Sequence, residues 1–145
     1  MSKEHNKVIV QQLVTEVWNK ADAGRVGEFY ADDFVFHTEG GDVQRGPESI
    51  RQWLQTTHGA FPDISYQIGA IYAEGDKVAF RYTVAGNNSG DFRGIPATGK
   101  TVHLTGHMIL HLNQDGKVIE GHGYWDTLGL MQQIGLVPEF GPPRA

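Results

Sequence analysis

The side chains best suited to acid–base chemistry are concentrated in residues 101–126. This stretch consists of two alternating runs separated by Asp115-Gly116, a dipeptide typical of a tight β-hairpin. One face of the first run carries polar side chains and the other is apolar. The polar face holds Thr101, His103, Thr105, His107 and His111, and the apolar face holds Val102, Leu104, Met108, Leu110 and Leu112.

The length of the turn decides which side chains meet. A two-residue turn at Asp115-Gly116 places His107 opposite Tyr124 and diagonally from Asp126, whereas a three-residue turn would separate these groups onto opposite faces. We predict the two-residue turn, with His107, Tyr124 and Asp126 facing the interior of the fold. Asp126 and His107 are then the candidate catalytic acid–base pair.

Each candidate has an ordinary structural alternative. Asp126 directly precedes a predicted helix, where aspartate is a favoured N-cap, and one carboxylate can fill both roles. His122, Tyr124 and His37 are candidate pocket residues that could hydrogen-bond a ligand carbonyl. Large aromatic residues more often form core than recognition surfaces, and three of them are also candidates to line a pocket: Trp18, Trp53 and Phe36.

The three histidines of the first run do not predict a metal site by themselves. Their spacing of four residues along a strand is about 13 Å, which is too far for two of them to bind one ion. A metal would need ligands from the second run, such as His122 or Glu120, so we expect no metal and no cofactor.

Composition excludes several classes of protein. The chain has 145 residues, a formal net charge of −5 and no cysteine, which argues against nucleic-acid or anionic-membrane partners and against thiolate catalysis. No apolar run is long enough to span a membrane, and the first residues lack a signal peptide's hydrophobic region. We expect one cytoplasmic domain over residues 1–145, with a proline-rich tail at 137–145.

The periodicities predict helices first and an antiparallel meander afterwards. Apolar residues at helical spacing favour helices at 3–23, 26–30, 46–59 and 127–134, and alternating runs favour strands at 34–38, 64–73 and 78–85 before the hairpin. This order is typical of an α+β fold with helices on one face of a curved sheet. Such a half-closed sheet leaves a cone-shaped pocket that can hold a small molecule.

Several passages resemble one family over nearly the whole chain. They are Phe61-Pro-Asp63 before a long strand, the loop Gly90-Asp-Phe-Arg-Gly-Ile-Pro-Ala-Thr-Gly-Lys-Thr-Val102, and Trp125-Asp126 with Leu130 and Gln133-Ile-Gly135. The chain resembles the SnoaL-like polyketide cyclases of the NTF2-like superfamily. The resemblance implies an α+β cone that binds a hydrophobic ligand and assembles through its outer sheet face.

The resemblance also implies a chemistry. The characterised cyclases close a ring by intramolecular aldol condensation without metal or cofactor, using an aspartate with a nearby histidine. Asp126 matches that aspartate, and His107 is the best local match for the histidine. One departure is that His122 stands where a tryptophan is common in the family.

The expected function is therefore cofactor-free ring closure of a polyketide-type carbonyl substrate. Two rivals remain: an NTF2-like epoxide hydrolase, for which Arg81 is the only strand arginine, and a non-enzymatic dimer that binds a small hydrophobic ligand. Because the apolar face of the hairpin has no evident cover within one chain, we also predict a homodimer through that face, with a tetramer as the alternative.

Overall fold

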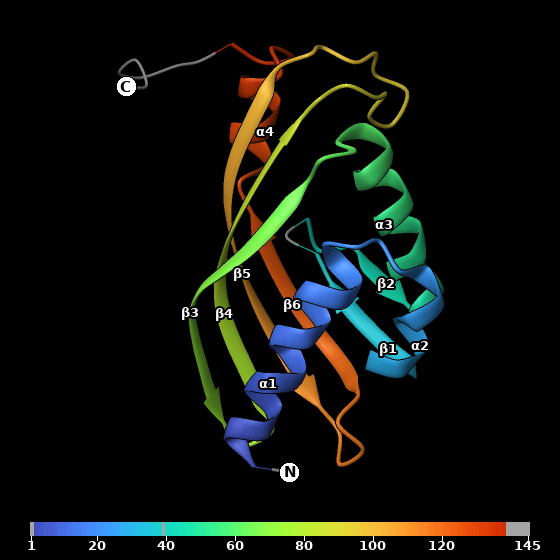
Figure 1. Ribbon diagram of the computed structural model, residues 1–145, viewed down its shortest axis with the longest axis vertical. Coiled ribbons are helices and arrows are strands. Elements are labelled where there is room, and N and C mark those ends of the chain that lie inside the picture. The colour runs from blue at the N-terminus through green and yellow to red at the C-terminus, as the bar shows by residue number, and fades with distance from the viewer. Residues whose placement is uncertain (1, 39, 139–145) are drawn as a thin grey trace.

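The computed structural model describes residues 2–38 and 40–138 and is built on one curved sheet of six strands in the order β2-β1-β6-β5-β4-β3 (Figure 1). All neighbouring strands are antiparallel except β1 and β6, which run parallel. The strands are β1 (Tyr30–His37), β2 (Val43–Arg45), β3 (Ser65–Glu74), β4 (Lys77–Asn87), β5 (Thr101–Leu112) and β6 (Val118–Trp125).

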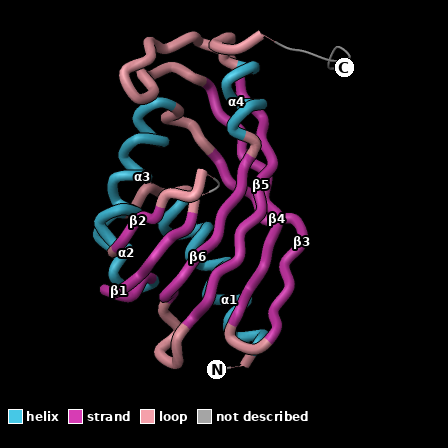
Figure 2. The backbone as a smooth tube through the Cα atoms, turned by 180° about the vertical axis from the view of Figure 1, so that it is seen from behind, coloured by secondary structure: helices cyan, strands magenta, loops and turns pink. Residues whose placement is uncertain are grey.

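The helices confirm the predicted α+β class. They are α1 (Lys3–Leu13), α2 (Val26–Phe29), α3 (Pro47–Ala60) and α4 (Thr127–Gln133). Helices α1 and α3 lie on the concave side of the sheet (Figure 1), and the view from behind shows strands β3 to β6 in front of α1 (Figure 2). The short strand β2 was not anticipated from the sequence pattern, and the parallel pairing of β1 with β6 makes the sheet mixed.

Helix α1 delivers an aromatic side chain to the inside of the cone. Ser2 caps its first turn by accepting a hydrogen bond from the His5 N–H, and Val10 and Leu13 form its buried stripe. The helix then widens into a π-turn over Val14–Trp18, a local change common at functional sites. The turn ends on Trp18, which is buried.

Alternation of burial along β4 and β5 separates the two faces of the sheet. On β5, even-numbered residues from Val102 to Leu112 are buried against the helices, and most of the odd-numbered ones are exposed. The exposed face, which we call the outer face, carries His103, His107 and Ile109. The apolar face of the hairpin therefore belongs to the core of its own chain.

This arrangement contradicts the predicted dimer interface. Leu104, Met108 and Leu110 are between 2% and 9% exposed, because the helices of the same chain cover them. The homodimer through the outer sheet face stays a prediction, but Leu104, Met108 and Leu110 do not lie on that face.

Helix α4 takes the place of a strand where β6 ends. The Gln133 side chain accepts a hydrogen bond from the His103 N–H at 2.8 Å and donates one to the His103 carbonyl at 3.0 Å. A side-chain amide thus reproduces the pairing that a longer β6 would give to β5. Leu130 and Ile134 on the inner side of the helix are buried.

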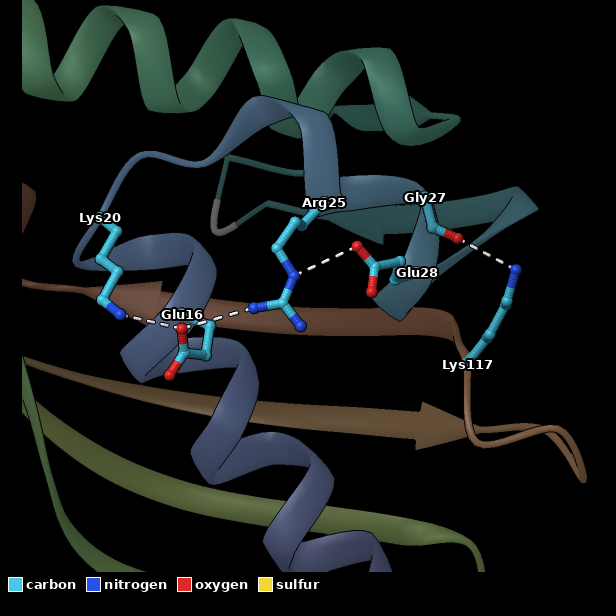
Figure 3. Close-up of polar contacts among 6 residues, drawn as sticks. All are labelled: Glu16, Lys20, Arg25, Gly27, Glu28 and Lys117. Atoms are coloured by element: carbon cyan, nitrogen blue, oxygen red, sulfur yellow. Dashed lines mark hydrogen bonds and ion pairs between the residues drawn. The ribbon is translucent and has the colours of Figure 1, made fainter.

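A surface network connects the end of the first helix with the hairpin turn (Figure 3). Glu16 accepts from Lys20 at 2.9 Å and from Arg25 at 3.4 Å, and the Lys117 ammonium donates to the Gly27 carbonyl at 3.0 Å. The hydrogen bond from Lys20 lowers the pKa of Glu16 below its ordinary value. Exposed pairs of this kind contribute little to stability, so the network orients these segments more than it stabilises them.

Glycine on β5 makes room for an aromatic ring, which gives a stability prediction. A Cβ at Gly106 would collide with the ring of Tyr82, whereas a Cβ at Gly69 on β3 would meet its nearest atom, the Arg81 carbonyl oxygen, at 3.7 Å. Gly106→Ala is expected to lower the free energy of unfolding by about 1–3 kcal/mol, the usual cost of overpacking. Urea denaturation with Gly69→Ala as the control tests this, and an equal effect of the two substitutions would contradict it.

Within the described residues, the structure has no helix with the length and apolar character needed to cross a bilayer. Of the predicted tail at 137–145, residues 139–145 lie outside the described part of the chain.

Candidate functional site

The concave side of the sheet encloses a cavity of about 520 Å³, which we call the cone cavity. Its walls come from the π-turn after α1, β1, α3, β4, the loop after β4, the β5–β6 hairpin and α4. Most of the lining is aromatic or aliphatic, and it includes Trp18, Phe34, Phe36, Trp53, Met108 and Trp125. A volume between about 300 and 1,000 Å³ with apolar walls is typical of a small-molecule site.

An aromatic cluster forms the floor. The Trp18 ring lies 5.3 Å from that of Trp53 and 5.9 Å from that of Tyr82, in edge-to-face arrangements. Its indole N–H donates to the Tyr30 hydroxyl at 3.0 Å. Burial raises the pKa of Tyr30 well above its ordinary value, so this hydroxyl stays neutral and serves to hold the floor.

The mouth of the cavity is polar. Thr38 and Asp42 contribute from the loop after β1, Gln44 from β2, and Arg93 from the loop between β4 and β5. The Thr38 N–H donates to the Asp42 carbonyl at 3.0 Å, which closes the first loop. A ligand in the cavity therefore meets apolar walls inside and one acidic and one basic side chain at the entrance.

Glycines on β6 make room for side chains of the neighbouring strands β1 and β5. A Cβ at Gly123 would lie 2.6 Å from the Phe36 ring and 3.0 Å from Met108. Gly121 is equally enclosed, with its added Cβ 3.1 Å from Leu110. In the sequence, glycine alternates with polar residues along 120–124, and this alternation was the signal that the glycine face of β6 lies against the core.

Three of the predicted pocket residues do line the cavity: Trp18, Trp53 and Phe36. Tyr124 is among the residues around the cavity, but it pairs with His107 across the β5–β6 ladder and is 57% exposed, so its side chain lies on the outer face and its predicted inward orientation is wrong. His37 and His122 do not line it. Their side chains lie on the outer face, where their rings stack with centroids 4.4 Å apart.

The predicted orientation of the catalytic pair is wrong. His107 is exposed between Gly106 and Met108, which both face inward, so its side chain lies on the opposite side of the sheet from the cone cavity. Asp126 is also exposed. The physical reason is that burying the apolar face against the helices forces the alternate residues outward.

The pairing of the hairpin was predicted correctly, but the turn was not. His107 pairs with Tyr124 and His111 pairs with Glu120, as expected. The turn has three residues, because Asn113 N–H bonds the Lys117 carbonyl at 2.8 Å and Gly116 adopts a positive φ of 77°. A bulge between His111 and Leu112 in the pairing then shifts the register by one residue and restores the expected partners.

Asp126 has the structural role that the sequence offered as its alternative. Its carboxylate accepts a hydrogen bond from the Gly129 N–H at 2.8 Å and caps α4. It also stands between Trp125 and Thr127, which both line the cavity. The acid–base role of Asp126 stays a prediction, and the cap places the residue at the rim instead of the interior.

The epoxide hydrolase alternative loses its candidate residue. Arg81 is exposed on the outer face, where it pairs with His107 across the β4–β5 ladder. It therefore cannot activate a water molecule inside the cone cavity. The residues that sequence reasoning did not single out are Asp42 and Arg93 at the mouth, which come from loops without a periodic pattern.

A family model for SnoaL-like polyketide cyclases matches residues 8–134, which confirms the resemblance noted in the sequence. No curated protein matches the chain.

Solved structures of similar proteins share the fold. AclR, "a putative hydroxylase" from Streptomyces galilaeus, is 26% identical with a TM-score of 0.85, over 97% of this chain and 87% of that one. IdmH, "a putative polyketide cyclase" from Streptomyces antibioticus, is 27% identical with a TM-score of 0.78, over 90% and 98%. A "putative SnoaL-like polyketide cyclase" from Jannaschia sp. CCS1 is 24% identical with a TM-score of 0.85, over 94% and 95%. Proteins with this fold are thus described both as a hydroxylase and as polyketide cyclases.

Proposed function

Because the chain belongs to the SnoaL-like polyketide cyclase family, we propose that it is a cofactor-free enzyme that closes a ring in a polyketide-type substrate by intramolecular aldol condensation. The observation that carries the proposal is the cone cavity, with its aromatic floor and polar mouth. A chain of carbonyl and methylene groups suits a cavity that is apolar inside and polar at its entrance. Its folded carbon chain contacts the aromatic rings, and its carbonyl oxygens reach the mouth.

The reaction needs little from the protein beyond positioning and one proton. A base removes a proton from a methylene flanked by two carbonyls, and the resulting enolate carbon attacks a carbonyl carbon further along the chain. The new C–C bond forms as the carbonyl π electrons move to oxygen, and that oxygen then takes up the proton. Nothing is oxidised or reduced, and a cavity that holds the two carbons in contact supplies much of the acceleration.

We assign the acid–base role to Asp126. It matches the catalytic position of the family, and both of its neighbours in sequence line the cavity. Asp126 would act first as the base and then return the proton to the alkoxide. Arg93 at the mouth can stabilise developing oxyanion charge.

The direct test is turnover on a panel of poly-β-keto esters without added metal or cofactor. The expected product has the mass of the substrate, or that mass less one water after dehydration, together with a new ultraviolet absorption. Heat-denatured protein serves as the control for spontaneous cyclisation. Absence of turnover on the whole panel, with binding intact, would favour the second candidate function.

That second candidate is a non-enzymatic binding protein for small hydrophobic ligands. The observation that favours it is the exposed Asp126 carboxylate, which is already engaged with the Gly129 N–H. A binding protein needs the cone cavity but no proton shuttle. Binding without turnover would therefore identify it.

Binding can be measured with the protein's own fluorescence, because all three tryptophans line the cone cavity: Trp18, Trp53 and Trp125. We expect a hydrophobic diketone to change tryptophan emission in a saturable way. Met131→Lys, which places a charge in the cavity wall, is expected to weaken binding at least about tenfold, equivalent to about 1.4 kcal/mol.

Leu128→Lys is the matched control, because Leu128 lies on the same helix with its side chain 47% exposed and outside the lining. It should leave the affinity unchanged. Equal weakening by both substitutions would show that the ligand does not enter the cavity.

A further inference from the structure

A half-buried cluster of His37, Glu120 and His122 lies on the outer face and takes no part in the cone cavity. The two histidine rings are parallel within 8°, with their centroids 4.4 Å apart. The Glu120 carboxylate lies near both rings. His37 Nε2 lies 3.1 Å from Glu120 Oε2, and His122 Nε2 lies 3.9 Å from Glu120 Oε1.

The backbone brings these residues together. His37 and His122 are directly paired across the parallel β1–β6 ladder. Glu120 lies two residues before His122, so strand alternation places its side chain on the same face. Both strands are interior strands of the sheet, so the cluster rests on a rigid part of the fold.

The ligand atoms of the three side chains are spaced close to the separations found around a bound metal ion. Bonds of about 2.0–2.2 Å from Zn²⁺ to imidazole nitrogen and carboxylate oxygen put tetrahedral ligand atoms about 3.3–3.5 Å apart. Here one ligand atom of each residue lies within 4.8 Å of the other two. To bind one ion, the two imidazole side chains would have to rotate out of their parallel stacking so that both ring nitrogens point at it.

We propose that His37, Glu120 and His122 bind a first-row divalent metal ion of the zinc type. Two imidazoles and one carboxylate suit zinc-type ions better than they suit Mg²⁺ or Ca²⁺, which prefer oxygen ligands. Three protein ligands leave a further position for water. This inference departs from the sequence-based expectation of no metal, and it is independent of the proposed ring closure, because the site and the cavity are on opposite faces of the sheet.

The position of the site gives the metal a structural role. His37 ends β1, and the next residue, Thr38, lines the mouth of the cone cavity. An ion that joins His37 to β6 would fix the start of the loop that forms one side of the mouth. The metal would then hold the entrance in place without touching the ligand.

A neighbouring pair on the same face supplies a matched control. His111 lies opposite Glu120 on β5, but its Nε2 is held at 2.7 Å by Asp76. Among the described residues, no third histidine or carboxylate brings a ligand atom close enough to complete this pair as a metal site. A metal that binds any exposed histidine–carboxylate pair would bind here as well.

The experiment titrates chelator-treated protein with Co²⁺ and follows its visible absorption, then repeats the titration with Zn²⁺ by calorimetry. We expect one ion per chain in wild type. Loss of one ligand in His122→Ala or Glu120→Gln should weaken binding at least about 100-fold, more than the loss typical of outer-shell partners. His111→Ala should leave the affinity unchanged.

The proposal is overturned if wild type and the His37→Ala/His122→Ala double variant bind equally, or if His111→Ala weakens binding as much as His122→Ala. A melting-temperature series with and without Zn²⁺ provides a readout that needs no activity. The ion should raise the melting temperature of wild type and of His111→Ala, and it should not raise that of the double variant. Circular dichroism of each metal-free variant confirms that it is folded before it is titrated.

Discussion

Asp126→Asn is expected to slow ring closure by about 10²–10⁴-fold, the usual contribution of a positioned acid or base. Asparagine caps helices about as well as aspartate, so the hydrogen bond with the Gly129 N–H at the start of α4 is kept. The melting temperature and the ligand affinity should therefore stay close to those of wild type. Turnover on the reactive poly-β-keto ester, measured beside the melting temperature, checks both expectations.

Asp42→Asn is the comparison for this prediction, because Asp42 is a carboxylate at the mouth that contributes directly to the lining. If Asp126 is the acid–base residue, Asp42→Asn should change turnover far less than Asp126→Asn. Unchanged turnover in a folded Asp126→Asn variant would leave Asp126 only its capping role. A large loss in Asp42→Asn alone would move the chemistry to the loop after β1.

Trp18→Ala is expected to lower the free energy of unfolding by about 3–5 kcal/mol, as removal of a buried tryptophan usually does. Trp18 is 2% exposed and packs against four aromatic rings. Its loss also leaves the buried Tyr30 hydroxyl without the indole donor. The melting temperature should fall by roughly 10 °C for a chain of this size, measured by differential scanning calorimetry.

Trp53→Ala is the matched control for Trp18→Ala. Trp53 also lines the cone cavity, but it is only half-buried. It should therefore cost less stability while still weakening ligand binding. Equal destabilisation by the two substitutions would show that the floor of the cavity is not centred on Trp18.

The architecture was predictable from the sequence because each main helix and strand carries its own periodic pattern. The alternation in 101–112 and the partners of His107 and His111 were identified correctly. The strand β2 was missed because its three residues, Val43–Arg45, are all exposed and too few to show a period.

The orientation of the hairpin could not be obtained from the pattern of polar residues alone. The sequence offers two faces, and the one with the histidines attracted the functional prediction. Burial of apolar area decides the orientation, since Leu104, Met108 and Leu110 gain far more from contact with the helices than histidines would. Gly121 and Gly123 leave room on this buried face for the side chains of Phe36, Met108 and Leu110.

The turn shows a second limit of local reasoning. Asp115-Gly116 favours a two-residue connection, but the side chain of Asn113 accepts from both the Asp115 and the Lys117 N–H, at 2.9 Å and 3.0 Å. These hydrogen bonds stabilise the longer turn. The bulge that follows compensates for the extra residue in the turn. The predicted strand partners are therefore correct although the predicted turn length is wrong.

The most direct test of the central claim, that substrate is held and cyclised inside the cone, is a crystal structure with a non-reactive diketone analogue. We expect the analogue to lie in the cone cavity against Trp18 and Trp53, with a carbonyl oxygen toward Arg93. An analogue bound only on the outer face beside His107, with the cavity empty, would contradict the account.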